Sequence, residues 1–211
     1  MAECTYVCFI IPRCKYFRTR VTIRDCHGIS NGRQIDLTAE EELEAYIKLC
    51  RNVLHHCSPE SASAIFAWNW PQLREQLKSL IINTKSDIKE VIFCFLGHGS
   101  PRGYGFDRGA AVNLDKILNY CDFLWRDSKP KFLTTKILFA QCYGYQVSPA
   151  IVSRLFVKYG IQVHSLTNRK RKVVKCTFKF ADNGCITNSC IPALTKWFRE
   201  ECGSFVYQAE E

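Results

Sequence analysis

The sequence predicts an α/β protein, a three-layer sandwich in which a mostly parallel central sheet carries helices on both faces. Short apolar runs of strand length alternate along the chain with stretches in which apolar residues recur every three or four positions, the spacing of a helix face. Two of the runs also stop abruptly at small residues, and an apolar run bounded by glycine is typical of a buried parallel strand. The expected strands of the sheet are residues 4–11, 63–68, 90–97, 135–141 and 161–166.

Helical periodicity fills the segments between these strands. The clearest start signal is a capping box, in which the side chains of Thr38 and Glu41 can bond the free N–H groups of a first helical turn. The expected helices are residues 38–57, 71–80, 114–121, 149–159 and 194–198. Residues 122–134 are polar and are expected to form a long loop. Alternating residues predict further strands over 18–25, as a hairpin or edge strand, and over 174–180, and 205–207 could add a final one.

Length and composition indicate one globular domain over residues 1–211. Hydrophobic residues make up 47% of the chain and charged residues 23%, as in folded proteins. No apolar run reaches the roughly 18 residues that a membrane-spanning helix requires. The first residues also lack the pattern of a secretion signal. We therefore expect a cytoplasmic protein with no membrane partner.

The chain contains 13 cysteines. In the apolar runs they are expected to act as small buried hydrophobes, and without a secretion signal we expect no disulfide framework. No Cys-x-x-Cys pair and no paired histidine spacing is present, so we expect no metal site and no cofactor. The cysteines inside apolar runs are Cys8, Cys50, Cys94, Cys121 and Cys176.

The net charge of +9 includes one basic cluster, residues 169–172, which reads Arg-Lys-Arg-Lys. Such a cluster is compatible with an anionic partner and equally with a solvated loop. No aromatic residue interrupts the run to stack on bases. We therefore expect little or no nucleic-acid binding at physiological salt.

The residues with the clearest chemical implication follow two of the expected strands. His98 stands between two glycines after the strand over 90–97, and Cys142 follows the strand over 135–141. Sites in open parallel sheets form beyond the carboxyl ends of the strands, so these two side chains, 44 positions apart, are expected to face one cleft.

Together, a histidine and a cysteine can carry out nucleophilic catalysis. The imidazole of a histidine titrates near neutral pH and can protonate a leaving amine. A cysteine nucleophile also requires hydrogen-bond donors for the oxyanion that it creates. The backbone N–H groups of Gly99 and of the turn at Cys142 to Gly144 are candidates for this role.

At these residues the sequence resembles the caspase-like cysteine peptidases of clan CD, the group that includes caspases, metacaspases and legumains. The resemblance is best over residues 91–144, where His98-Gly99 is similar to the family's His-Gly motif and the Gln-Cys-x-Gly run of residues 141–144, preceded by Ala140, is similar to its Gln-Ala-Cys-x-Gly motif. It implies a caspase-like fold and a thioester acyl-enzyme. Cys142 would attack the scissile carbonyl, the N–H groups of Gly99 and Cys142 would hold the oxyanion, and His98 would protonate the departing amine.

The resemblance also implies where a substrate binds. In the family the wall that sets specificity follows the fifth strand. Gln141, beside the nucleophile, stands where caspases carry a small buried residue, because the two residues before the cysteine are exchanged. The candidate substrate-binding residues are Gln141, Ser165, Thr167, Asn168 and Arg169.

The function that we expect is a cysteine endopeptidase acting on a peptide or protein substrate, and a homodimer is left open. Caspase-like folds also include inactive members, so the alternative is a catalytically inactive scaffold in protein–protein interaction or signalling. A cysteine hydrolase or transferase of another kind on a similar sheet is a third reading.

Overall fold

The computed structural model describes ten parts of the chain, residues 5–13, 19–24, 30–37, 62–83, 88–106, 110–130, 134–141, 143–166, 178–180 and 186–188. The chain divides into two compact units, one made of Met1–Cys14 with Ser61–Val173 and the other of Lys15–Glu60 with Val174–Glu211. Each unit is described by itself, and the organisation of residues 1–211 as one peptidase domain stays a prediction.

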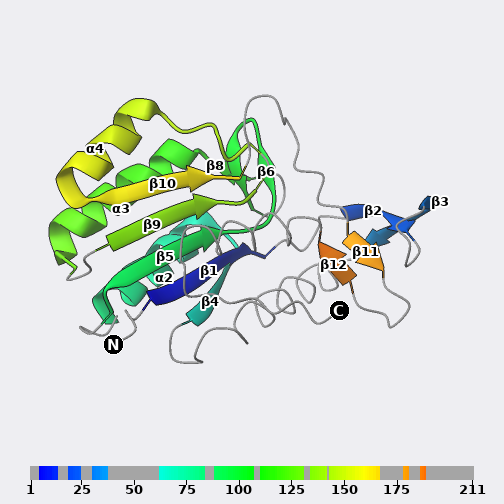
Figure 1. Cartoon of the computed structure of the whole chain (residues 1–211), viewed down its shortest axis with the longest axis horizontal. Coiled ribbons are helices and arrows are strands. Elements are labelled where there is room, and N and C mark those ends of the chain that lie inside the picture. Colours follow the sequence, from blue (N-terminus) through cyan, green and yellow to red (C-terminus); the bar gives the residue numbers. More distant parts are fainter. Residues whose placement is uncertain are drawn as a thin grey trace. The chain divides into compact units, whose positions relative to one another are not determined.

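A five-stranded sheet forms the centre of the first unit (Figure 1). Its strands are β1 (Thr5–Pro12), β4 (Ala62–Ala67), β5 (Glu90–Phe95), β9 (Thr134–Phe139) and β10 (Ile161–Ser165), in the order β10-β9-β5-β1-β4. Each neighbouring pair is parallel. The predicted α/β class, with a mostly parallel central sheet, is therefore confirmed.

Both faces of the central strands are buried. Along β1, the consecutive residues Val7, Cys8, Phe9, Ile10 and Ile11 are all 0% exposed, although their side chains point alternately to opposite faces. Continuous apolar strands of this kind are typical of parallel sheets that are covered on both sides. This burial is what a three-layer sandwich requires.

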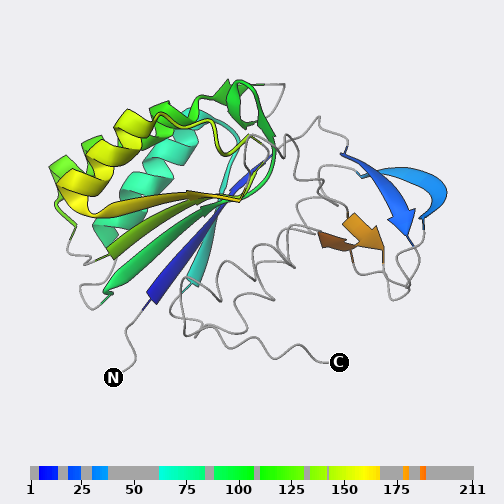
Figure 2. The same cartoon turned by 45° about the horizontal axis from the view of Figure 1, so that its top comes forward.

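Three helices lie over one face of the sheet, α2 (Trp70–Asn83), α3 (Leu114–Ser128) and α4 (Pro149–Tyr159), as Figure 2 shows. Their apolar side chains join one hydrophobic cluster with alternate residues of the strands, which explains why their sequences have the 3.6-residue period of an amphipathic helix. The helices predicted over residues 38–57 and 194–198 lie outside the described residues.

Helix α3 corrects one prediction. Residues 122–134 were expected to form a loop, but the helix continues to Ser128 and ends where Lys129 takes up a left-handed conformation with φ 42°. Leu124 and Trp125 are 1% and 6% exposed, and Trp125 meets the ring of Phe93 edge-on at 5.9 Å. They lie three and four positions after Cys121, so they extend its buried face by another turn. The charged residues of this segment, Asp122, Arg126 and Asp127, masked this periodicity.

The carboxylate of Asp122 on α3 binds side chains of α4. The Tyr159 hydroxyl donates to Asp122 Oδ1 at 2.8 Å, and Arg154 Nε lies 3.3 Å from Asp122 Oδ2. Burial by itself would raise the pKa of Asp122, but this hydrogen bond and the positive charges of Lys158 and Arg154 outweigh it and lower the pKa. The two helices are thus joined through a carboxylate that is ionised at neutral pH.

The second unit contains two short antiparallel pairs. Strand β2 (Thr19–Arg24) pairs with β3 (Ser30–Leu37), and β11 (Phe178–Phe180) pairs with β12 (Ile186–Asn188). Strand β2 confirms the strand that alternation predicted over residues 18–25, whereas its partner β3 was not predicted. None of the helices in the described parts of the chain has both the length and the apolar character that crossing a bilayer demands.

Candidate active site

The carboxyl ends of the strands are joined by backbone hydrogen bonds that continue past the paired residues. The N–H of Ala140, after β9, donates to the carbonyl of Phe95 at the end of β5 at 2.9 Å. The N–H of Leu166, after β10, donates to Phe139 O at 3.1 Å. The segments that follow β5, β9 and β10 therefore begin side by side at one edge of the sheet, where sites of parallel sheets form.

Gly97 turns the chain out of the sheet just before His98. It has φ +104°, a conformation that a residue with a side chain rarely adopts. A Cβ at this position would also lie 2.6 Å from Cδ of Pro12, at the end of β1. Glycine is thus required both by the backbone conformation and by the close approach of β1, and His98 follows as a half-buried residue at the rim.

A small antiparallel sheet holds the backbone at His98 and just after it. It consists of β6 (Gly99–Ser100), β7 (Gly103–Gly105) and β8 (Ala111–Val112). The carbonyl oxygen of His98 accepts the Gly105 N–H at 2.9 Å, and Gly99 pairs with Tyr104. His98 and the candidate oxyanion donor Gly99 therefore lie on a backbone held by hydrogen bonds.

Tyr104 fastens this small sheet to the central one. Its side chain is 0% exposed, and its hydroxyl donates toward two carbonyl oxygens, Leu96 O at 2.7 Å and Ile10 O at 3.0 Å. The two acceptors lie at the ends of β5 and β1, so one hydroxyl ties both strand ends together two residues before His98. Sequence reasoning missed this residue. The available signal was a large aromatic side chain between Gly103 and Gly105.

On the neighbouring strand, the residues after β9 form a tight turn. The Gly144 N–H donates to Gln141 O at 3.2 Å, and Tyr143 has φ 60°, which is rare for a residue with a side chain. A Cβ on Gly144 would lie 2.9 Å from both Phe139 O and Ser165 Oγ. The turn therefore packs closely against the end of β9 and against Ser165 of β10.

The side chain of Gln141 is 0% exposed. Neither its oxygen nor its nitrogen has a hydrogen-bond partner within the described residues. An unpaired buried amide is costly, by roughly 1–3 kcal/mol per group, and such groups are uncommon in folded proteins. Gln141, one of the two residues that are exchanged relative to the caspase motif, is thus fully buried and has no hydrogen-bond partner among the described residues.

The structure brings together four of the predicted site residues at one edge of the sheet, His98 and Gly99 after β5, Gln141 after β9 and Ser165 at the end of β10. The others, Cys142, Thr167, Asn168 and Arg169, lie outside the described residues. Cys142 is bonded to two described residues, Gln141 and Tyr143. The pairing of His98 with Cys142 stays a prediction.

The cysteines within the described residues, Cys8, Cys94 and Cys121, are buried, as the sequence predicted. Burial raises the pKa of Cys8 and of Cys121 to about 12, although a hydrogen bond with Ser63 lowers that of Cys8 slightly. Both thiols therefore stay protonated and unreactive at neutral pH. Cys50 and Cys176 lie outside the described residues.

No cluster of three or more histidine, cysteine, aspartate or glutamate side chains that could hold a metal ion occurs in the parts of the chain that the structure describes. No model of a known protein family matches the chain, and no curated protein sequence matches it either. The resemblance to caspase-like peptidases stays a prediction, and function is inferred from the residues at the carboxyl edge of the sheet.

Proposed function

We propose that the protein is a cysteine endopeptidase that uses His98 and Cys142. The observation that carries the proposal is the pairing of β5 with β9. His98 follows the first of these parallel strands and Cys142 the second, so both follow neighbouring strands at the same edge of the sheet. Chain segments at such an edge can supply catalytic groups from positions that are far apart in the sequence.

The proposed reaction begins when the thiol of Cys142 passes its proton to His98 and its sulfur attacks the carbonyl carbon of the scissile peptide bond. The N–H groups of Gly99 and Cys142 stabilise the negative charge that develops on the carbonyl oxygen. The C–N bond then breaks, His98 protonates the departing amine, and a thioester joins the acyl part to Cys142. Water hydrolyses the thioester, which releases the acid and restores the thiol.

The conformation of the turn after β9 supports this chemistry. The left-handed Tyr143 and the closely packed Gly144 make a sharp bend, and backbone N–H groups in such bends can bind an anion. The buried amide of Gln141, which has no hydrogen-bond partner among the described residues, adds support, because a role in a functional site is one explanation for such a group.

The proposed substrate is a peptide or protein, with Ser165, Thr167, Asn168 and Arg169 as contacts, and no nucleic acid takes part. The side chain of Gln141 was expected among these contacts, but it is 0% exposed and is therefore left out of them. The proposed location is the cytoplasm, with the thiols of Cys8 and Cys121 in support, since a reducing compartment preserves thiols.

Labelling with iodoacetamide at pH 7.5, followed by mass spectrometry of the full chain, tests the nucleophile. Cys142 should react first, whereas Cys8 and Cys121, with pKa values raised to about 12, should stay unlabelled while the protein is folded. The matched control is Cys121→Ala, which should leave the fast labelling unchanged. Slow, uniform labelling of all thiols would contradict the proposal.

Cleavage of a peptide library by variants of His98 and Cys142 tests the reaction. Cys142→Ala should abolish turnover, and Cys142→Ser should nearly do so, because a serine hydroxyl is far less ionised. His98→Ala should be about 10²–10⁴-fold slower, yet a peptide electrophile should still alkylate its Cys142. If Cys142→Ala cleaves at the wild-type rate, the inactive scaffold becomes the better assignment.

A further inference from the structure

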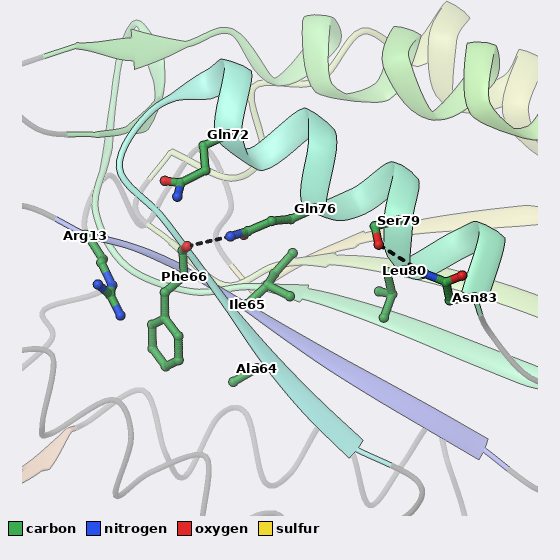
Figure 3. A pocket seen from close by; sticks show the side chains of 9 residues that line it. All are labelled: Arg13, Ala64, Ile65, Phe66, Gln72, Gln76, Ser79, Leu80 and Asn83. Carbon is green, nitrogen blue, oxygen red and sulfur yellow. Dashed lines mark hydrogen bonds between the residues drawn. The ribbon is translucent and has the colours of Figure 1, made fainter.

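A groove in the first unit lies between helix α2 and the edge strand β4 (Figure 3). Its volume is about 530 Å³, within the range of sites that bind small molecules or short peptide segments. The proposed peptidase function does not use it. Its walls are β4 on one side, the stripe of α2 from Gln72 to Asn83 on the other, and Arg13 at one end.

The β4 wall of the groove is the outer edge of the sheet, since β4 is the last strand in the described order. The carbonyl of Ala67 accepts the N–H of Arg13 at 2.7 Å, so the backbone groups of Ala67 face β1. In a strand, successive residues direct these groups to opposite sides, and those of Phe66 and Ala64 therefore face away from β1. Gln76 Nε2 donates to Phe66 O at 3.1 Å, in agreement with this assignment.

Two polar groups of the groove are buried without a hydrogen-bond partner among the described residues, Arg13 Nε and Gln76 Oε1. The first is a cationic donor and the second an acceptor, so together they suit a ligand that offers a negatively charged acceptor and an N–H. The guanidinium is already oriented, because it lies 5.4 Å from the ring centroids of both Phe66 and Trp68.

The dimensions of the groove match an extended chain. Helix α2 rises by about 16 Å between Gln72 and Asn83, the length of about five residues in a β-strand. No acidic side chain is among the described residues that line the groove, so Arg13 has no charge partner there. An extended segment could pair with the edge of β4 and bring a carboxylate to the guanidinium.

We propose that this groove binds a short extended peptide segment that carries an acidic side chain. The segment adds to the sheet beside β4, and its backbone pairs with the outward groups of Ala64. Its carboxylate accepts from Arg13, and one of its N–H groups donates to Gln76 Oε1. Main-chain pairing supplies affinity in binding of this kind, and the charged contact supplies selectivity.

Fluorescence anisotropy with two labelled hexapeptides tests the proposal. The probes are Ser-Val-Thr-Glu-Val-Ser and the same peptide with glutamine in place of glutamate. The full chain carries Cys142→Ala, which prevents cleavage of the probe if the chain is a peptidase. The glutamate peptide should bind about tenfold more tightly than the glutamine peptide, because charge-assisted hydrogen bonds exceed neutral ones by about that factor.

Two variants separate the charge from the backbone contact. Arg13→Gln should remove the difference between the two peptides. Ala64→Pro removes an outward N–H at an edge position that tolerates proline, so it should weaken both peptides and keep their difference. The matched control is Lys78→Gln, which removes one positive charge from an exposed position of α2 and should change neither affinity.

Circular dichroism and thermal unfolding establish whether each variant is folded. If Arg13→Gln does not fold, the comparison of the two peptides and the effect of Ala64→Pro still test the proposal. Equal binding of the two peptides overturns the proposal, as does the absence of binding at millimolar protein. The proposal is also overturned if glutarate displaces the labelled peptide as well as the unlabelled glutamate peptide does, because the site would then bind small carboxylates. Each of these results leaves the peptidase proposal intact, because the probes report on a chain that lacks Cys142.

Discussion

Replacing Tyr104 by phenylalanine removes a single buried hydroxyl and leaves the ring contacts in place. The ring meets Phe95 edge-on at 5.5 Å and Phe106 at 5.4 Å, and phenylalanine would keep both contacts. What disappears is the donor that reaches Leu96 O and Ile10 O, at the ends of β5 and β1. The substitution therefore isolates the hydrogen bonds that join the two strand ends before His98.

The size of the destabilisation depends on which hydrogen bonds the two carbonyl oxygens retain in the variant. Ile10 O still accepts the Leu96 N–H at 2.9 Å, so the penalty falls mainly on Leu96 O. A buried acceptor that loses its donor costs about 1–3 kcal/mol, and we expect the free energy of unfolding to fall by that amount. For a chain of this length each kcal/mol lowers the melting temperature by about 2–4 °C.

Tyr120→Phe is the matched control, because the hydroxyl of Tyr120 also donates to a backbone carbonyl, Arg74 O at 3.1 Å, but at an exposed position. Urea unfolding of the wild type and both variants gives the comparison. The control should change the free energy of unfolding by less than about 0.5 kcal/mol. If Tyr104→Phe is no more destabilising than Tyr120→Phe, the hydroxyl of Tyr104 does not hold the strand ends.

Two further predictions concern the packing of the first unit. Gly97→Ala should cost about 2–4 kcal/mol in urea unfolding, because it adds backbone strain and a clash with Pro12. The control is Gly160→Ala, at φ +68° with nothing within 4 Å of the added Cβ, which should cost only the strain of about 1 kcal/mol. If the two variants lose the same free energy of unfolding, the contact with Pro12 is unimportant. The second prediction concerns pH. The folded state keeps the proton of Cys121 up to about pH 12, whereas the unfolded chain loses it near pH 9, so the stability that this thiol contributes is complete below pH 9 and is lost as pH rises toward 12. In Cys121→Ala the free energy of unfolding should therefore fall less steeply between pH 9 and 11, by roughly 1 kcal/mol per pH unit, and equal slopes would contradict the burial of this thiol.

Local pattern was sufficient to locate the five strands of the central sheet and the three described helices, because an apolar run or a 3.6-residue period is a property of neighbouring residues. The strand predicted over 90–97 is β5, Glu90–Phe95, with its ends shifted by no more than two residues. The end of α3 was mispredicted, since the charged residues after Cys121 hid the buried face that Leu124 continues. Strands as short as β6, β7 and β8, with two or three residues each, contain too few residues to show a period.

Some residues of the candidate site could likewise be found from the sequence, and others could not. The sequence alone identified His98 and Gly99 as residues at the end of a strand, because small residues stop the apolar run before them. Gln141 and Ser165 were named from the resemblance to caspase-like peptidases. The sequence could not identify Tyr104, whose hydroxyl reaches a carbonyl 94 positions away. That contact exists only because β1 and β5 are neighbours, a property of the folded sheet.

By itself, then, the sequence determined the class of fold, the positions of the strands and the residues that stand at their carboxyl ends. Only the tertiary structure decided the order β10-β9-β5-β1-β4, which puts β4 at an edge and lets Arg13 and Gln76, 63 positions apart, line one groove. The physical reason is that the period of side chains depends on the local backbone. The choice of neighbours depends on packing between segments that are distant in the sequence.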